Sequence, residues 1–423
     1  MKTNVIKSQL FGEYTHAVLD NGLSVYVMEK PNFASSYAVF GTKYGSIDTR
    51  FSRNGQKETE VPAGIAHFLE HKLFESEEGD TFERFAKTGA YANAFTSFDR
   101  TCYLFSCTKN FEENLDILLD FVQSPYFTVE TVEKEQGIIA QEIKMYEDNP
   151  GWRVLFNMLS SMYENHPVKI DIAGTVDSIS KIDHNLLYEC YNTFYNPSNM
   201  YLCIAGNVKT SEVLAQVQMS IKPTEKVTVK RAKFSEENKV QSYYVEQSLE
   251  VARPIFCLGF KECFETEPTV RDKMVAGITL ELLAGECSEL YRRLVDSSLI
   301  GEEFSSEYFQ GDGYSAIIFE GESENPEAVA EEIKKEVKKA LSFGINESLL
   351  EAIKKSAYGD AVKRFDNTEA IVMGMIDCAI FGGTLFDAAD TLKTISAKDI
   401  IDRLKTLNDE TAVLSVIRPK RKG

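Results

Sequence analysis

The chain has 423 residues, of which 43% are hydrophobic and 26% are charged. This composition is that of an ordinary globular protein, so it excludes disordered and fibrous architectures, and the length predicts roughly two or three domains. The 46 lysine and arginine residues are outnumbered by 65 aspartate and glutamate residues, which gives a net charge of −19. Because so negative a surface repels phosphate backbones, we expect no nucleic-acid partner.

The sequence carries no signal for export or for membrane insertion. Its first residues, MKTNVIKSQLFGEYTH, lack the apolar segment of a signal peptide. No run approaches the roughly eighteen apolar residues that a transmembrane helix needs. The eight cysteines are scattered and form no CxxC pair. We therefore expect a cytoplasmic protein with reduced core thiols and no membrane contact.

Turn residues, helix caps and prolines divide the first half into elements. Asp80 is expected to cap one helix, Gly89 to end it, and Asn110 to cap the next. Proline at positions 125 and 150 ends the helix that precedes it. In chain order, the predicted elements are a strand over residues 23–28, helices over 65–74 and 81–88, a hairpin of strands over 91–98 and 101–107, and helices over 110–124 and 128–146. Their irregular alternation favours an α+β fold over a parallel doubly wound sheet.

A polar, charged segment near the midpoint, residues 221–239, predicts a boundary between two domains. We accordingly expect a first domain over residues 1–222, a linker over 223–239 and a second domain over 240–423. The two halves also share a weak internal similarity, which suggests a diverged duplication. The similar segments are YAVFGTK at residues 37–43 and IFCLGFK at residues 255–261.

The segment His67-Phe-Leu-Glu70-His71 carries the strongest chemical signal. Residues four apart on a helix lie one turn apart on the same face, so the two imidazoles can bind one metal ion. Glu70 lies beside that face, within reach of a water molecule at the metal. The alternative is a pair of core histidines on an amphipathic helix.

A zinc hydrolase also needs a third protein ligand and an open position for water. On the helix predicted over residues 128–146, Glu135 and Glu142 lie within about 20° of the same face. Glu147 lies about 140° away from Glu142, and Glu133 is on the opposite side. A buried pair of carboxylates is costly unless a metal or a histidine neutralises it. We therefore expect Glu142 to be the ligand and Glu135 to orient a histidine, although both could be surface glutamates.

The sequence contains an HxxEH motif followed by two glutamates seven residues apart. In this it resembles the inverzincins, the insulysin and pitrilysin family of zinc peptidases that includes mitochondrial processing peptidase. The likeness is dense in the first half and thin in the second. It is greatest to bacterial members that have two homologous domains in each chain. The matching residues are, in order, His67-Phe-Leu-Glu70-His71 with Leu73-Phe74, Ala92-Asn-Ala-Phe-Thr96, Glu135 with Glu142, His166-Pro167, Gly174-Thr175, Phe194-Tyr195, Pro197, Asn199-Met200 and Gly206-Asn207.

The resemblance implies an architecture, a cofactor and residue roles. It implies two homologous layered domains, each a mostly antiparallel sheet packed with helices, that together form half of a clamshell chamber. It also implies one Zn²⁺ per chain, bound by His67, His71 and Glu142. Glu70 then activates the attacking water, and Glu135 is the second residue that we expect to assist catalysis.

The segment Ala92-Asn93-Ala94-Phe95 resembles the edge strand with which this family pairs an extended peptide through main-chain hydrogen bonds. Asn93 is the side chain there that we expect to touch the substrate. Main-chain pairing makes weak demands on sequence, so the expected substrates are short or unfolded peptides. The alternative is that this segment is an ordinary hairpin strand.

One departure from the family pattern lies in the second domain. Active members carry there an arginine and a tyrosine seven residues apart, which bind the substrate carbonyl and the oxyanion. Val295 and Glu302 align with those positions, and neither side chain can donate as required. The nearby arginines and tyrosines do not have the required spacing: Arg292, Arg293, Tyr308 and Tyr314. We therefore expect a heterodimer with a homologous chain that lacks HxxEH and supplies the pair, with a homodimer as the alternative.

From the sequence, we expect the chain to be a zinc metalloendopeptidase that acts in peptide maturation or in leader-peptide processing. A non-catalytic zinc-binding scaffold subunit of a peptidase-like complex is the alternative from another class. Scaffold members typically lose HxxEH or the distal glutamate, whereas this chain keeps both. A different metal hydrolase on an unrelated fold is disfavoured by the ordered run of matches.

Overall fold

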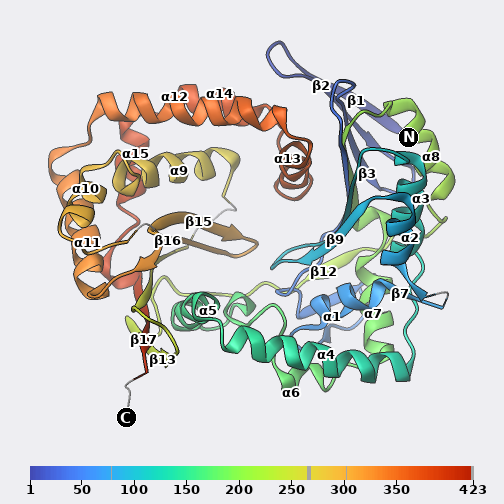
Figure 1. The fold of residues 1–423 in the computed structure, drawn as a ribbon, viewed down its shortest axis with the longest axis horizontal. Coiled ribbons are helices and arrows are strands. Elements are labelled where there is room, and N and C mark those ends of the chain that lie inside the picture. Colours follow the sequence, from blue (N-terminus) through green and yellow to red (C-terminus); the bar gives the residue numbers. More distant parts are fainter. Residues whose placement is uncertain (78, 264–267, 302, 421–423) are drawn as a thin grey trace. The chain divides into compact units, whose positions relative to one another are not determined.

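The computed structural model describes residues 1–77, 79–263, 268–301 and 303–420 (Figure 1). The chain divides into two compact units, each of which combines helices with a β-sheet. The predicted α+β fold with two layered domains is therefore confirmed. Unit 1 comprises Met1–Ile143, Asp171–Ala232 and Val362–Phe386, and unit 2 comprises Lys144–Ile170, Lys233–Ala361 and Asp387–Gly423.

Unit 1 is built on a seven-stranded sheet in the order β1-β2-β3-β11-β4-β10-β9. All neighbouring strands are antiparallel except β3 and β11, which are parallel. Its central strands are buried along their whole length, because helices cover both faces. The strands are β1 (Lys2–Ser8), β2 (Gly12–Val18), β3 (Ser24–Glu29), β4 (Ser36–Thr42), β9 (Tyr91–Thr96), β10 (Thr101–Cys107) and β11 (Met200–Gly206).

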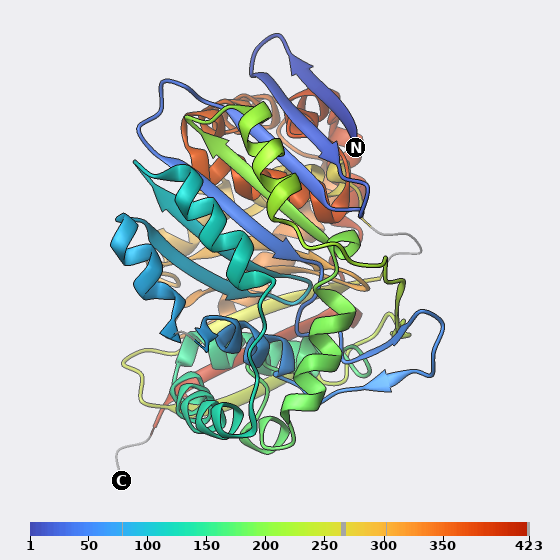
Figure 2. The same ribbon diagram turned by 90° about the vertical axis from the view of Figure 1, so that its right-hand side faces the viewer.

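Alternate side chains of these strands form two separate cores, as the two-residue period of a strand requires. One core packs Phe40, Phe105 and Ile204 against helices, which include α3 and α8, seen in teal and light green in front of the strands in Figure 2. The other packs Val39 and Cys203 against α13. The helices that lie wholly within unit 1 are α1 (Ile65–Leu73), α2 (Thr81–Thr88), α3 (Phe111–Val122), α6 (Val176–Ile179), α7 (His184–Phe194), α8 (Thr210–Ser220) and α13 (Thr368–Phe381).

Unit 2 is built on a five-stranded sheet in the order β13-β17-β14-β16-β15, with β13 and β17 parallel. This order and these directions repeat those of β3-β11-β4-β10-β9 in unit 1. The two similar segments, residues 37–43 and 255–261, fall on the equivalent strands β4 and β14, as a duplication predicts. The strands are β13 (Tyr244–Leu249), β14 (Ile255–Glu262), β15 (Ser305–Gly311), β16 (Tyr314–Glu322) and β17 (Ala412–Pro419).

Each unit includes one helix from the opposite half of the sequence. Helix α5 (Pro150–Met162) packs on β14 and β17 of unit 2, whereas α13 packs on β4 and β11 of unit 1. Each of these helices follows a long one, α4 (Val129–Glu147) or α12 (Glu347–Lys363). The compact units therefore differ from the segments 1–222 and 240–423, which remain our prediction for the repeated halves. The other helices of unit 2 are α9 (Val270–Ala284), α10 (Glu289–Asp296), α11 (Pro326–Phe343), α14 (Asp387–Thr394) and α15 (Ala397–Leu404).

The polar segment predicted as a linker contains one of the three points at which the chain passes from unit 1 to unit 2, at Ala232–Lys233. The part of this segment in each unit makes contacts within that unit. In unit 1, β12 (Val229–Arg231) pairs with β5 (Arg50–Arg53), and Arg231 Nε lies 2.7 Å from Asp48 Oδ1. In unit 2, the carboxylate of Glu236 accepts hydrogen bonds from backbone N–H groups and from Lys261 Nζ, at 2.7 Å.

The predicted boundaries of the first-half elements agree closely with the structure. Helix α2 begins after Asp80, whose side chain accepts a hydrogen bond from Phe82 N–H, and ends at Gly89 in the left-handed conformation. The prediction for Asn110 is wrong in one respect. Asn110 precedes α3 but has a φ of 56°, and its side chain makes no capping hydrogen bond, because its amide donates to Thr88 O instead. Within the described residues, no helix is both long and apolar enough to cross a membrane.

Candidate metal centre

The start of helix α1 is fixed by two glycines that let distant backbone segments touch. Gly64, at the N-cap of α1, has a φ of 90°, which favours glycine. A Cβ atom on Gly64 would lie 2.4 Å from Ala173 O, and one on Gly174 would lie 2.5 Å from Ala63 O. The two segments therefore pack backbone to backbone. Gly174, one of the residues that match the family pattern, thus helps to position α1.

Three predicted ligands converge between α1 and α4. The Nε2 atom of His67 lies 3.7 Å from Glu142 Oε1, and the Nε2 atom of His71 lies 3.5 Å from Glu142 Oε2. One potential ligand atom from each of these residues lies within 4.8 Å of the others. Among the described residues, this is the one group of three such side chains close enough to share a metal ion. Two imidazoles and a carboxylate are the ligand types of catalytic zinc sites.

Glu135 contacts His71 at Nδ1, the ring nitrogen that does not face Glu142. Its Oε1 atom lies 3.0 Å from His71 Nδ1, and the residue is buried. Because a carboxylate only accepts, Nδ1 of His71 carries the proton in this contact, and Nε2, which faces Glu142, is the ring nitrogen that can bind a metal. The residue predicted to orient a histidine therefore contacts one, in the arrangement that prepares a ligand.

The surroundings of the two histidines favour a bound cation. Burial, with the neighbouring His71, lowers the pKa of His67 to about 3, so this ring is in the neutral form that binds metals. Burial also lowers the pKa of His71, but the hydrogen bond to Glu135 and three nearby carboxylates outweigh burial and raise it. The Nδ1 atom of His67 is buried and has no hydrogen-bond partner among the described residues. A carboxylate-rich site with converging imidazole nitrogens fits a divalent metal ion.

Glu70 lies on α1 with only 9% of its surface exposed. Thr96, the last residue of β9, donates a hydrogen bond from its hydroxyl to Glu70 Oε2 at 2.6 Å. Burial raises the pKa of Glu70, although Thr96 and His71 partly oppose this shift. Thr96 is the contact that sequence reasoning missed. It lies within a matched motif, but only the packing of β9 against α1 shows what its hydroxyl reaches.

The other glutamates considered on α4 lie away from this group. The side chains of Glu130, Glu133 and Glu147 are exposed, whereas Glu135 is buried and Glu142 is half-buried. Glu135 and Glu142, which the helical angle places on one face of α4, are therefore the two carboxylates that lie beside the histidines. The predicted pairing strand, Ala92 to Phe95, lies in β9 at the edge of the sheet, next to α1.

Two family models match most of the chain. Residues 55–176 match the model described as insulinase (peptidase family M16), and residues 181–357 match that of the peptidase M16 inactive domain. A relative called uncharacterized zinc protease YmfH, from Bacillus subtilis (strain 168), is 44% identical over 392 residues, which are 91% of each chain. The chain belongs to the insulinase family, peptidase family M16.

Solved structures show the same fold for this M16 chain. A putative M16-like peptidase from Alicyclobacillus acidocaldarius is 34% identical, with a TM-score of 0.94 over 98% of this chain and 100% of that one. A protease from Helicobacter pylori is 20% identical, with a TM-score of 0.83 over 96% and 99% of the two chains. Pitrilysin is 16% identical, with a TM-score of 0.77 over 99% of this chain but 46% of its own. The last two likenesses concern the fold alone.

The second half of the M16 chain was expected to lack an arginine and tyrosine pair. Val295 lies on α10 with 44% of its surface exposed, and Glu302 lies outside the described residues. Arg293 is bound by Glu336 Oε2 at 2.7 Å. Tyr308 makes a hydrogen bond with Ser315, and its ring lies 4.5 Å from the guanidinium of Arg403. Arg293 and Tyr308 therefore already have structural partners in unit 2.

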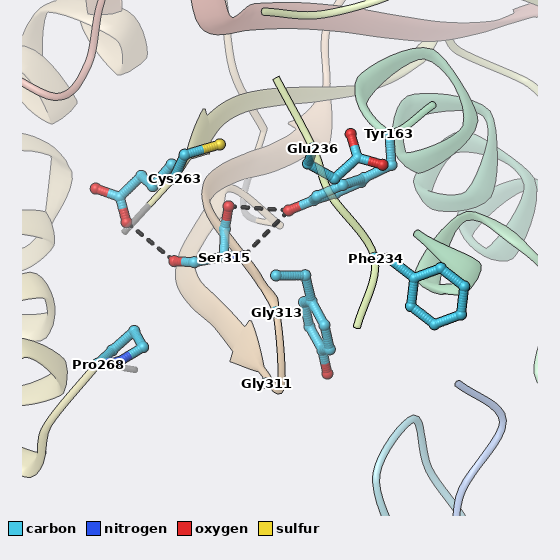
Figure 3. A pocket seen from close by; sticks show the side chains of 10 residues that line it. Tyr163, Phe234, Glu236, Cys263, Pro268, Gly311, Gly313 and Ser315 are labelled. Atoms are coloured by element: carbon cyan, nitrogen blue, oxygen red, sulfur yellow. Dashed lines mark hydrogen bonds between the residues drawn. The ribbon is translucent and has the colours of Figure 1, made fainter. Parts of the chain in front are cut away.

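Unit 2 of the M16 chain also contains a cavity of about 160 Å³ (Figure 3). Tyr163 donates a hydrogen bond to Ser315 O at 2.9 Å, and the hydroxyl of Ser315 lies 3.0 Å from Glu262 Oε2. Glu262 is also bound by Arg403 at 2.9 Å and Thr406 at 2.6 Å. Because these polar groups satisfy one another, we interpret the cavity wall as a structural network.

Proposed function

We propose that this chain is the zinc-binding catalytic subunit of a metalloendopeptidase that hydrolyses short or unfolded peptides. The observation that carries the proposal is the convergence of the Nε2 atoms of His67 and His71 on Glu142, with Glu70 beside them. Relatives named as zinc proteases support zinc as the ion, and we propose one ion per chain.

Zinc bound by His67, His71 and Glu142 would supply the Lewis acidity that polarises the scissile carbonyl. Glu70 takes a proton from the attacking water and then gives it to the leaving amine. Thr96 donates a hydrogen bond to Glu70 Oε2 at 2.6 Å, and we propose that the other carboxylate oxygen takes the proton. Burial raises the pKa of Glu70 toward the working pH, which suits a group that must both accept and release a proton. Glu135 keeps the ring of His71 in place.

The substrate is proposed to bind as an extra strand along β9, at Ala92, Asn93, Ala94 and Phe95. This strand ends at Thr96, whose hydroxyl contacts Glu70. A peptide paired along β9 therefore runs toward the catalytic carboxylate. Main-chain pairing selects extended segments and accepts many side chains, as leader-peptide processing or peptide maturation would require.

We propose that the active enzyme is a heterodimer with a homologous chain that lacks HxxEH and carries the arginine and tyrosine pair. The departure at Val295 and Glu302 and the structural partners of Arg293 and Tyr308 support this proposal. Loss of oxyanion donors costs about 2.7–4 kcal/mol, or about 10²–10³ in rate. The isolated chain is therefore expected to bind zinc but to cleave a fluorogenic peptide about 10²- to 10³-fold more slowly than the mixture with the partner.

The measurement is a titration of the purified chain with the partner chain, with zinc content determined in parallel. The partner should restore cleavage without adding zinc. Rapid cleavage by the isolated chain that does not change when the partner is added would contradict the heterodimer and favour the homodimer. Zinc binding without cleavage under either condition would favour the scaffold role.

A further inference from the structure

The outer strand of the unit 1 sheet, β9, has an open edge, since no strand among the described residues pairs with its far side. In the turn to β10, Ser97 N–H donates to Arg100 O at 2.8 Å, which makes these residues a hydrogen-bonded pair. Such pairs alternate along an antiparallel ladder with pairs whose N–H and C=O groups point outward. Ala94 is opposite Tyr103, three pairs further on. The N–H and C=O of Ala94 therefore point to the open edge.

The side chain of Asn93 covers this outward N–H. Ala94 N–H donates a hydrogen bond to Asn93 Oδ1 at 2.9 Å. Asn93 Nδ2 in turn donates to the hydroxyl of Tyr91 at 3.4 Å, which turns Oδ1 toward the backbone. Tyr91 and Asn93 are both exposed and lie on the same face of the strand, two residues apart. The covering side chain is therefore free to swing into solvent.

We propose that Asn93 is a reversible cap on the edge of β9, which an extended peptide must displace before it pairs. In the bound state, a carbonyl oxygen of the peptide replaces Asn93 Oδ1 as the acceptor for Ala94 N–H. An uncovered edge strand pairs readily with other extended chains, so the cap also protects the free chain from unwanted pairing. The peptide part of this inference rests on the proposed function, whereas the cap is a property of the free chain.

Hydrogen exchange at the Ala94 amide tests the cap without any reference to activity. A typical hydrogen bond contributes a net 0.5–1.5 kcal/mol, so Asn93→Ala should accelerate this exchange by about 2- to 10-fold. Tyr91→Phe is the matched variant, because it keeps Oδ1 and removes only the group that orients it, and it should cause a smaller acceleration. The Phe95 amide, which faces β10, serves as the internal reference. Exchange at Ala94 that is the same in wild type and Asn93→Ala would overturn the cap.

Peptide binding then tests what the cap does. In a Glu70→Gln background, which prevents cleavage, Asn93→Ala should lower the Kd of a fluorescently labelled unstructured peptide by about 2- to 10-fold. A higher Kd would show that the Asn93 side chain binds the peptide, as the sequence alone predicted, and does not compete with it. That result would overturn the inference and leave the proposed function intact. If Glu70→Gln fails to bind peptide both with and without Asn93→Ala, in the presence of the partner chain, that would count against the proposed function. The hydrogen-exchange result alone would then show whether Asn93 covers the Ala94 amide.

Discussion

Glu70→Gln is expected to abolish peptide cleavage while zinc remains bound to the chain. Glutamine has nearly the same shape and can still accept the hydrogen bond from Thr96, but it cannot take a proton from water. General base catalysis typically contributes about 10²–10⁴ in rate, so we expect a loss of that size or greater. Zinc should stay because Glu70 is not one of the three converging ligands. The measurements are fluorogenic-peptide cleavage with the partner chain present and the zinc content of the same sample.

The matched control is Glu133→Gln, which makes the same change on an exposed side chain of α4. It should leave both cleavage and zinc content at wild-type values. Cleavage by Glu70→Gln at a rate close to wild type would show that another group is the base. Loss of zinc from this variant would place Glu70 among the ligands.

Substitution of Glu142 with glutamine should remove zinc from the chain. The carboxylate of Glu142 faces both histidine Nε2 atoms and supplies the one anionic ligand of the group. Substitution of an outer residue that orients a ligand typically lowers metal affinity by about 10- to 100-fold, which is the loss we expect for Glu135→Gln. Loss of a direct ligand should exceed about 100-fold.

The control on the same helix is Glu147→Gln, because Glu147 is exposed. Competition with a chelator of known affinity gives the zinc affinity of each variant. We expect the largest loss of zinc affinity in Glu142→Gln, a smaller loss in Glu135→Gln and no change in Glu147→Gln. Full zinc occupancy in Glu142→Gln would show that Glu142 is not a ligand. Loss of zinc from Glu147→Gln would show that Glu147 is the ligand instead.

Local patterns were sufficient to predict the elements that carry the site. Helix α2 was predicted from its cap and its terminal glycine, and both act as expected. The pair Glu135 and Glu142 was selected from its helical angle and from the cost of burying two carboxylates without a partner, and the structure places both beside the histidines. These predictions succeeded because helix and strand periodicity depends on residues that are close in sequence.

Features that depend on distant packing could not be predicted in the same way. Helix α5 packs on the sheet of unit 2, and α13 packs on the sheet of unit 1. To predict this, one must know which sheet each apolar helix face contacts, and sequence periodicity does not contain that information. Thr96 reaches Glu70 only because β9 packs against α1. Asn110 was expected to cap α3, but the nearby Thr88 carbonyl competes for its side chain. In each case a tertiary contact decided the outcome.

Zinc-edge anomalous diffraction from crystals of the zinc-loaded chain tests the central claim most directly. We expect a single anomalous peak per chain. It should lie about 2.0–2.2 Å from His67 Nε2, His71 Nε2 and a carboxylate oxygen of Glu142, with Glu70 outside that distance. A peak held by other residues, or no peak at this position in a chain shown to contain zinc, would contradict the account.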